Sequence, residues 1–492
     1  MHKKGLIGGI ALLALSAVGG GLATASPERD VLVPAEPTMI DFVDPATVGG
    51  LVARTLSDAD RGHGHARRLV HITYPELRDA PRLNRALHDE AERTLHHFRD
   101  LTKFDAPRPR PELNVDWQLA AASGDIVGVR LRTGESLGNG WSNSIRTLWY
   151  DRRTGKATGS AGLLSGRAAL RDLTRLVKDR LAKRGSPTDP GRVTGDQLDS
   201  MAFNQGGDLV VEFDDCQVGP CSLGRLAVAV PARQADPLLS PTGRRAQEAV
   251  REAARQAAPT VPRTVPSSSP EAVSNRAGSV DCAKAKCVAL TFDDGPGPDT
   301  PRLLDMLHRA GARATFFTVG TSAAARPDLL VRMSVEGHLV ANHSWAHLDL
   351  SKLTTSKIAD SLRRTQDTIT AAIGERPTLM RAPYGALNED VMDVAGDMGL
   401  AIVGRNVDAG DKYTNDAKAI ADRVTRQARV GAIVLMHGVH PATVDAVPDI
   451  LKKLQGKGYT LVTVPELYGT AGMQAGHLYR SGSEIARHRP LT

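Results

Sequence analysis

The stretch Thr291-Phe292-Asp293-Asp294-Gly295-Pro296 (TFDDGP) decides the fold, because it ends an apolar segment with two adjacent carboxylates. Residues 288–292 form a mostly apolar run that is typical of a buried β-strand. Neighbouring side chains on a strand point to opposite faces, so one carboxylate can bind a metal ion while the other serves as a base. Gly-Pro then turns the chain away. A strand that simply ends in an acidic turn is the alternative for this motif alone.

Short apolar runs alternate with amphipathic stretches over the C-terminal part of the chain. Strands are predicted at residues 288–292, 314–319, 378–381, 401–404, 432–436 and 459–462. Helices are predicted between them, at residues 301–310, 327–336, 355–373, 389–398, 416–428 and 442–455. This alternation implies a parallel sheet or barrel wrapped by helices, in which motifs at the carboxyl ends of strands gather on one face.

The segment His343-Ser344-Trp345-Ala346-His347 (HSWAH) places two imidazoles four residues apart. On one helical turn both could face a single ion, and Asp294 would complete a set of two histidines and one carboxylate. Such a set is common in catalytic metal sites because it leaves positions open for water and substrate. Without the other motifs, surface or core histidines explain the pair equally well.

Two further motifs follow candidate strands. Arg381-Ala382-Pro383-Tyr384-Gly385 (RAPYG) begins with an arginine that can pair with a buried carboxylate and hold it in place. Leu435-Met436-His437 (LMH) ends an apolar strand with a histidine suited to proton transfer near neutral pH. Asp408 and Asp411 lie in the loop after another strand, and either could orient this histidine. Each motif alone is also compatible with a purely structural role.

In this order, TFDDGP, HSWAH, RAPYG, DAGD (residues 408–411) and LMH resemble the motifs of the polysaccharide deacetylase family, carbohydrate esterases that share the nodulation-factor deacetylase homology domain. The similarity covers about Cys287 to Tyr468, within a catalytic domain expected at residues 281–470. The resemblance implies an α/β fold, a distorted (β/α) barrel. It also implies a divalent metal, Zn²⁺ in most members, with Co²⁺ or Mn²⁺ as alternatives.

The resemblance assigns the metal site and the base to named residues. Asp294, His343 and His347 would be the metal ligands. Asp293 would be the general base, and Arg381 would tether its carboxylate.

The resemblance also assigns the acid and the acetyl pocket. Pro383 and Tyr384 would shape the pocket, with the Tyr384 backbone N–H in the oxyanion site. His437 would be the general acid, oriented by Asp411.

The chain departs from the family pattern at two positions. Lys412 follows the second aspartate of the fourth motif, where many members have tryptophan. Gly438 follows the histidine of the fifth motif, where members often have aspartate. These departures concern the pocket wall and the tuning of the acid rather than the metal ligands.

The N-terminus has the features of a secretion signal, expected at residues 1–25. Lys3 and Lys4 precede an uncharged, mostly apolar run from Gly5 to Leu22, and Ala23-Thr24-Ala25 offers a cleavage site. A retained membrane anchor is the alternative. A secreted, cell-wall-associated protein is therefore expected.

A smaller α+β domain is expected at residues 60–235, after a lead-in loop, and a Pro/Ser-rich linker at residues 236–280. Strands are predicted at residues 69–74, 126–131 and 145–150, a hairpin at residues 209–213 and 226–230, and helices at residues 82–98, 168–182 and 241–257. Residues 471–492 are expected to form a loosely ordered tail.

This smaller domain resembles an extracytoplasmic domain that precedes some secreted deacetylases and also occurs in a lysozyme-sensing anti-sigma factor. The resemblance rests on Tyr74-Pro75 with the following helix, on residues 150–155, and on the stretch from Phe213 to Pro231. It implies a module that binds the cell wall or a protein.

Four cysteines form two C-x4-C pairs, Cys216 with Cys221 and Cys282 with Cys287. Disulfides are the default in an exported protein, and the two local pairings are favoured among three connectivities. Zinc binding by these pairs is the weaker alternative.

The formal net charge of +7 favours anionic surfaces such as wall polymers. The basic residues are spread along the chain without a nucleic-acid-binding motif, so no nucleic-acid partner is expected. The expected function is metal-dependent hydrolysis of N-acetyl groups on cell-wall glycan, most simply peptidoglycan, by a monomer. The alternatives are a chitin-oligomer or xylan deacetylase and a catalytically silent wall-binding or sensor protein. A metallopeptidase ranks lowest because the chain lacks H-E-x-x-H.

Overall fold

The computed structural model describes residues 39–56, 68–102, 110–137, 141–184, 188–220, 225–256, 280–469 and 472–482. The expected secretion signal, Cys221 and most of the predicted linker lie outside these residues. Among the described helices, none combines the length and the apolar character that crossing a bilayer requires.

The N-terminal module, residues 39–256, contains a six-stranded sheet in the order β1-β2-β3-β4-β5-β6. These strands are β1 (Leu51–Leu56), β2 (Leu69–Leu77), β3 (Glu112–Ala122), β4 (Ile126–Ser136), β5 (Trp141–Asp151) and β6 (Lys156–Gly159). Helix α1 (Pro81–Leu101) buries an apolar stripe that includes Leu83, Leu87 and Leu95 against the side chains of the sheet. The pairing of β2 with β3 is parallel, and the other pairings are antiparallel.

A second cluster of elements completes the module. Its three-stranded antiparallel sheet consists of β7 (Ser200–Phe203), β8 (Leu209–Phe213) and β9 (Leu226–Val230), and its helices are α2 (Arg167–Arg184), α3 (Ala232–Ala235) and α4 (Pro241–Gln256). Ala246 and Val250 of α4 pack in the same apolar cluster as Trp149. The predicted hairpin is confirmed by the pairing of β8 with β9. Because α4 packs on the module, the folded region extends beyond residue 235.

The barrel, residues 280–482, is a nine-stranded sheet in which every pairing between its named strands is parallel. The spatial order is β15-β16-β10-β11-β12-β13-β14-β18, and β17 pairs with β10. The strands are β10 (Lys286–Asp293), β11 (Thr315–Thr318), β12 (Leu339–Asn342), β13 (Leu379–Met380), β14 (Ala401–Val403), β15 (Val407–Asp408), β16 (Ala432–His437), β17 (Tyr459–Val462) and β18 (Leu478–Tyr479). This is the expected distorted (β/α) barrel.

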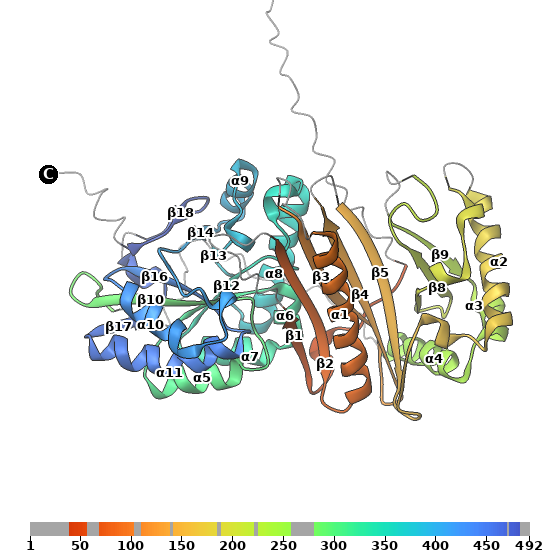
Figure 1. Cartoon of the computed structure of the whole chain (residues 1–492), viewed down its shortest axis with the longest axis horizontal. Coiled ribbons are helices and arrows are strands. Elements are labelled where there is room, and N and C mark those ends of the chain that lie inside the picture. The colour runs from red at the N-terminus through yellow and green to blue at the C-terminus, as the bar shows by residue number, and fades with distance from the viewer. Residues whose placement is uncertain are drawn as a thin grey trace, which may run out of the picture. The chain divides into compact units, whose positions relative to one another are not determined.

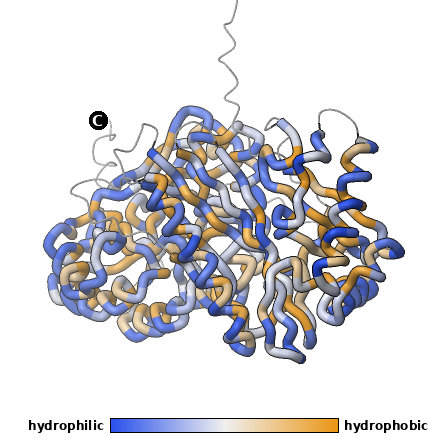
Figure 2. The backbone as a smooth tube through the Cα atoms, turned by 45° about the vertical axis from the view of Figure 1, so that its right-hand side comes forward, coloured by the Kyte–Doolittle hydropathy of each residue, from blue (hydrophilic) through white to orange (hydrophobic). Residues whose placement is uncertain are grey.

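Helices surround the barrel strands (Figure 1). They are α5 (Thr300–Arg309), α6 (Gly320–Ala325), α7 (Pro327–Val335), α8 (Thr355–Ile373), α9 (Glu389–Asp397), α10 (Ala417–Gln427) and α11 (Pro441–Gly456). Apolar side chains of strands and helices, such as Leu290, Leu304 and Ile450, share one buried cluster. Along the helices the hydrophilic and hydrophobic residues alternate, as amphipathic helices on a core require (Figure 2).

Several segments differ from the sequence prediction, and β6, β7, β12, β15 and α6 were not predicted. Residues 51–56 form β1 instead of a lead-in loop, and β3 was not predicted at all. Residues 478–479 form β18 instead of loose tail, because β14 offers an edge that this strand covers and Tyr479 packs against Tyr468 at 5.0 Å between ring centroids. The Cys282–Cys287 disulfide is confirmed, and Cys216 is also disulfide-bonded.

Polar residues of β3 contact the barrel. Glu112 is fully buried, and its carboxylate accepts hydrogen bonds from the Lys352 ammonium at 2.8 Å and from the Asp349 backbone N–H at 3.0 Å. Asn114 donates to the backbone carbonyl of Ala346 at 2.8 Å. Burial raises the pKa of Glu112 to about 7, although the neighbouring Lys352 lowers it.

A pH-dependent stability follows from this buried carboxyl group. A raised pKa means that the folded protein holds the Glu112 proton more tightly than the unfolded chain does. The contribution of this group to the free energy of unfolding is therefore fully present below about pH 4.5 and falls as the pH rises to about 7. Glu112→Gln stays neutral at every pH. We expect the stability of the wild type to fall relative to that of Glu112→Gln by about 3 kcal/mol across this window, measured by denaturant unfolding. A difference that does not change with pH would contradict this account.

Candidate active site

The predicted site residues lie at the carboxyl edge of the parallel sheet. Asp293 ends β10 and His437 ends β16, and the register of these strands pairs the two residues directly. His343 follows β12, and Arg381 follows β13. Because parallel strands end on the same edge, residues more than 140 positions apart in sequence come together here, as the sequence predicted.

Strained backbone marks the same place. Among the described non-glycine residues, five have a positive φ, and four of these are Asp294 (71°), Ser344 (66°), His347 (58°) and Tyr384 (59°). Each such conformation costs about 1–3 kcal/mol and persists where surrounding structure enforces it. The prediction of a helical turn for HSWAH is therefore wrong: the segment is an irregular loop. Asn342 Oδ1 accepts the Ser344 N–H at 2.8 Å, and Ser344 Oγ accepts the His347 N–H at 3.1 Å.

The imidazoles of His343 and His347 both lie against the carboxylate of Asp294 despite the different loop conformation. Nε2 of His343 lies 3.3 Å and Nε2 of His347 lies 3.2 Å from Oδ1 of Asp294. Ligand atoms about 2.1 Å from a tetrahedral zinc ion would lie about 3.4 Å apart, so these spacings fit a bound divalent ion. Within the described part of the chain, nothing donates a hydrogen bond to the buried Oδ1 of Asp294. This oxygen is therefore available as a ligand.

The protonation states of these groups also suit a metal. Burial raises the pKa of Asp294, but the Lys412 ammonium and the His347 imidazole outweigh this effect and hold the pKa well below its usual value. Burial lowers the pKa of His347 to about 4. Nδ1 of His343 lies 2.7 Å from the backbone carbonyl of Arg381, so it donates there and leaves Nε2 free to coordinate. The site thus offers an ionised carboxylate, the neutral imidazole of His347 and the free Nε2 of His343.

The carboxylate of Asp293, next to Asp294 in the chain, is held by Arg381. The Arg381 guanidinium donates to Oδ1 of Asp293 at 2.7 Å and to the Thr291 hydroxyl at 2.7 Å. It also donates to the backbone carbonyls of Val403 and Gly404 and lies over the Phe317 ring, so it is fixed on all sides. The predicted tether between Arg381 and Asp293 is present in the structure.

Asp411, and not Asp408, orients His437. Oδ1 of Asp411 lies 2.9 Å from Nδ1 of His437, and Oδ2 accepts the His437 backbone N–H at 2.6 Å and the Thr443 hydroxyl at 2.7 Å. Burial raises the pKa of Asp411, but His437 and its other partners lower it far more, so the carboxylate is ionised. Asp408 pairs with Arg405 instead. Thr443 was not predicted, because nothing in a helix-opening Pro-Ala-Thr marks a buried hydroxyl.

The barrel is similar to known proteins. A family model of polysaccharide deacetylases matches residues 281–403. A chitooligosaccharide deacetylase of Bradyrhizobium is 36% identical over 204 residues, which cover 38% of this chain and 93% of that enzyme. The chain belongs to the polysaccharide deacetylase family.

Two peptidoglycan deacetylases are also similar to this family member. The N-acetylglucosamine deacetylase PgdA of Listeria monocytogenes is 42% identical over 195 residues, 39% of this chain and 41% of that protein. The N-acetylmuramic acid deacetylase PdaC of Bacillus subtilis is 40% identical over 183 residues, 37% of this chain and 38% of that protein. The similarity thus spans about two fifths of these two relatives.

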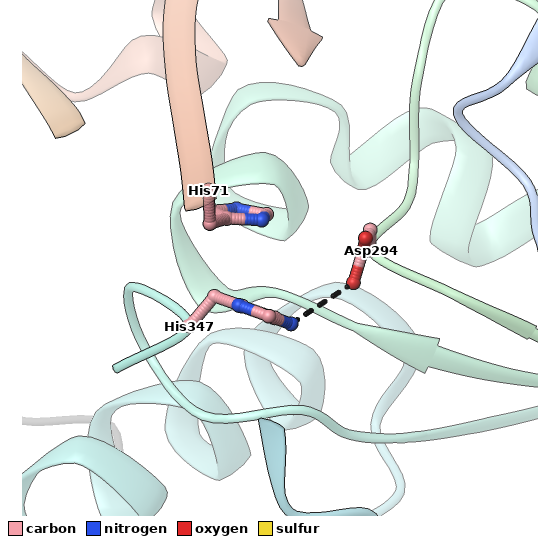
Figure 3. A group of neighbouring side chains, drawn as sticks. All are labelled: His71, Asp294 and His347. Carbon is pink, nitrogen blue, oxygen red and sulfur yellow. Dashed lines mark ion pairs between the residues drawn. The ribbon is translucent and has the colours of Figure 1, made fainter. Parts of the chain in front are cut away.

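Two side chains at the metal site depart from what the family motifs led us to expect. Nζ of Lys412 lies 3.8 Å from Oδ2 of Asp294. His71 of β2 stacks on His347 with 4.0 Å between ring centroids and 18° between ring planes (Figure 3). The sequence offered a weak signal for His71, a histidine within an otherwise apolar strand, but its contact with the barrel could not be predicted.

Replacement of the central carboxylate tests the metal site. We expect Asp294→Asn to weaken Zn²⁺ binding by about 100-fold or more, because the anionic ligand between the two imidazoles is lost. Titration calorimetry of the metal-free protein measures this. Asp299→Asn, five positions along the same loop, is the control and should bind as the wild type does. Equal affinities in both variants would contradict the assignment.

Proposed function

We propose that the barrel is a metal-dependent polysaccharide deacetylase that hydrolyses N-acetyl groups of amino sugars in cell-wall peptidoglycan. One observation carries this proposal: Asp294, His343 and His347 converge beside a tethered carboxylate, Asp293, whose strand partner is His437. Membership of the polysaccharide deacetylase family supports the same reaction.

Asp294, His343 and His347 would hold the metal ion, and the set of one carboxylate and two imidazoles favours Zn²⁺, with Co²⁺ or Mn²⁺ as alternatives. When bound, such an ion acts as a Lewis acid that polarises a carbonyl oxygen and lowers the pKa of water.

Asp293 is the general base in this scheme. Its carboxylate accepts a proton from the water that attacks the acetyl carbonyl carbon. Arg381 fixes the carboxylate through Oδ1, which leaves Oδ2, 3.8 Å from Nε2 of His343, on the side of the metal ligands. The base is therefore held beside the place where the water must lie.

Tyr384 and His437 complete the reaction. Tyr384 follows Pro383 in the first positions of a short turn, where backbone N–H groups have no partner within the turn. Its N–H donates to the oxyanion that forms on the acetyl oxygen. His437, whose Nδ1 is bound to Asp411, donates the proton on Nε2 to the departing amine. The C–N bond breaks, and acetate and a free amino sugar leave.

Peptidoglycan is the substrate we favour. Two relatives with 42% and 40% identity are peptidoglycan deacetylases, and the net charge of +7 suits an anionic wall. Secretion through the signal at residues 1–25 and wall or protein binding by the N-terminal module belong to the same proposal, with the protein acting as a monomer.

The two candidate aspartates allow a matched test of the acid. We expect Asp411→Asn and His437→Ala to lower kcat for acetate release by about 100-fold or more, because the imidazole loses its orientation or is absent. Asp408→Asn lies three positions from Asp411 but contacts Arg405, so it should retain near wild-type activity. Acetate release is followed from acetylated glycan. Equal rates in all three variants would reject the mechanism.

The substrate is tested by comparing acetate release from peptidoglycan, chitin oligomers and acetylated xylan. We expect peptidoglycan to give the highest kcat/KM, and mass spectrometry of its digested fragments to place the free amine on glucosamine or muramic acid. A higher kcat/KM on xylan or chitin oligomers would replace peptidoglycan in the proposal without changing the chemistry.

A further inference from the structure

We propose that His71, from the N-terminal module, is a further ligand of the metal ion and occupies the position that the substrate needs, so that the docked module keeps the enzyme latent. This inference rests on the metal site of the proposed function. It concerns a residue that belongs to none of the family motifs and lies more than 200 positions before them in the chain.

The position of His71 is that of a ligand. One ligand atom each from His71, Asp294 and His347 lies within 4.8 Å of the others, and all three residues are buried. Nε2 of His71 has no hydrogen-bond partner among the described residues, although its side chain is only 2% exposed. An unpartnered polar atom at this depth is costly unless something binds it. In Figure 3 the His71 ring lies above that of His347, and both rings extend toward Asp294.

The contacts around His71 are specific to this docked arrangement. Asn114, on the strand beside β2, donates to the backbone carbonyls of Ala346 at 2.8 Å and His347 at 3.3 Å. The module therefore binds the loop that carries His347. Glu112 binds Lys352 on the same side of the barrel. Ala325 of α6 packs in the apolar cluster of the module. Polar and apolar contacts thus both position His71 over the metal site.

Coordination requires a small shift and a turn of the His71 ring out of its stack on His347, because the lone pair on Nε2 lies in the plane of the ring. Ligand atoms around a zinc ion lie about 3.4 Å apart, so a spacing of at most 4.8 Å closes with movement of roughly an ångström. The parallel register of β2 with β3 ties His71 to Asn114, which keeps this movement local. His343 does not belong to this group of three, so the ring nitrogens of His71 and His343 must both approach the ion before a fourth protein ligand fills the position that Asp294, His343 and His347 would leave open. A closed set of four ligands is typical of structural zinc sites, whereas catalytic sites keep one position for water or substrate.

The number of imidazoles on the ion tests the proposal directly. X-ray absorption of the full-length Zn²⁺ protein should show three imidazole nitrogens in the wild type and two in His71→Ala. Asn114→Asp places a carboxylate against the backbone carbonyls of Ala346 and His347, and their repulsion should undock the module. This variant should also show two imidazole nitrogens. His88→Ala is the matched control, because His88 lies in the same module but bonds to Tyr74. Circular dichroism verifies that each variant is folded.

Activity gives a second readout. If docking blocks the substrate, kcat/KM for acetate release should rise by about tenfold or more in His71→Ala and in Asn114→Asp, and stay unchanged in His88→Ala. Two imidazoles in the wild type, or three in His71→Ala, would overturn the proposal whatever the activity. If the imidazole count falls as expected but no variant releases acetate, the deacetylase function fails while His71 remains a ligand. If the count falls and activity does not rise, His71 is a ligand and the latent state is rejected.

Discussion

The buried charge of Asp294 is the constraint on which the site depends. A carboxylate that is 2% exposed cannot stay ionised unless cations or polar hydrogens surround it. The Lys412 ammonium does so here, and the positive-φ backbone of Asp294, His347 and Tyr384 keeps the site in place. Backbone strain of this kind persists only where surrounding structure enforces it, and hydrogen bonds to Asn342 Oδ1 and Ser344 Oγ do so in the loop that carries both imidazoles.

The sequence predicted the barrel because the lengths of its apolar runs and the periodicity of its amphipathic stretches indicate the same fold. Apolar runs such as 432–436 have the length of buried strands, and stretches such as 355–373 have helical periodicity. Once the strands are parallel, their carboxyl ends share an edge, so Asp293 and His437 become neighbours without any knowledge of side-chain packing. The position of these residues is thus a consequence of topology.

Features that depend on contacts between residues distant in sequence could not be predicted from the sequence. HSWAH has the spacing of a helical turn, yet Asn342 and Ser344 hydrogen bonds impose a left-handed loop that local propensity does not indicate. The short strand β18 forms only because β14 offers an edge. β3 differs, since Leu113, Val115, Trp117 and Leu119 alternate with polar residues in the sequence itself. The polar residues Glu112 and Asn114 of this strand are buried because they contact the barrel.

Lys412 affects the buried charge of Asp294. Many family members carry tryptophan at this position, whereas here an ammonium lies 3.8 Å from the carboxylate that would bind the metal. A divalent ion on Oδ1 of Asp294 and this ammonium near Oδ2 would repel each other, which weakens binding of the ion. The Lys412 side chain is 29% exposed, which gives it a path to solvent. Lys412 also compensates the buried charge of Asp294, and positive-φ backbone fixes the loops that carry Asp294 and His347. A site that is preorganised in this way loses little conformational entropy on binding the ion, which offsets part of the repulsion.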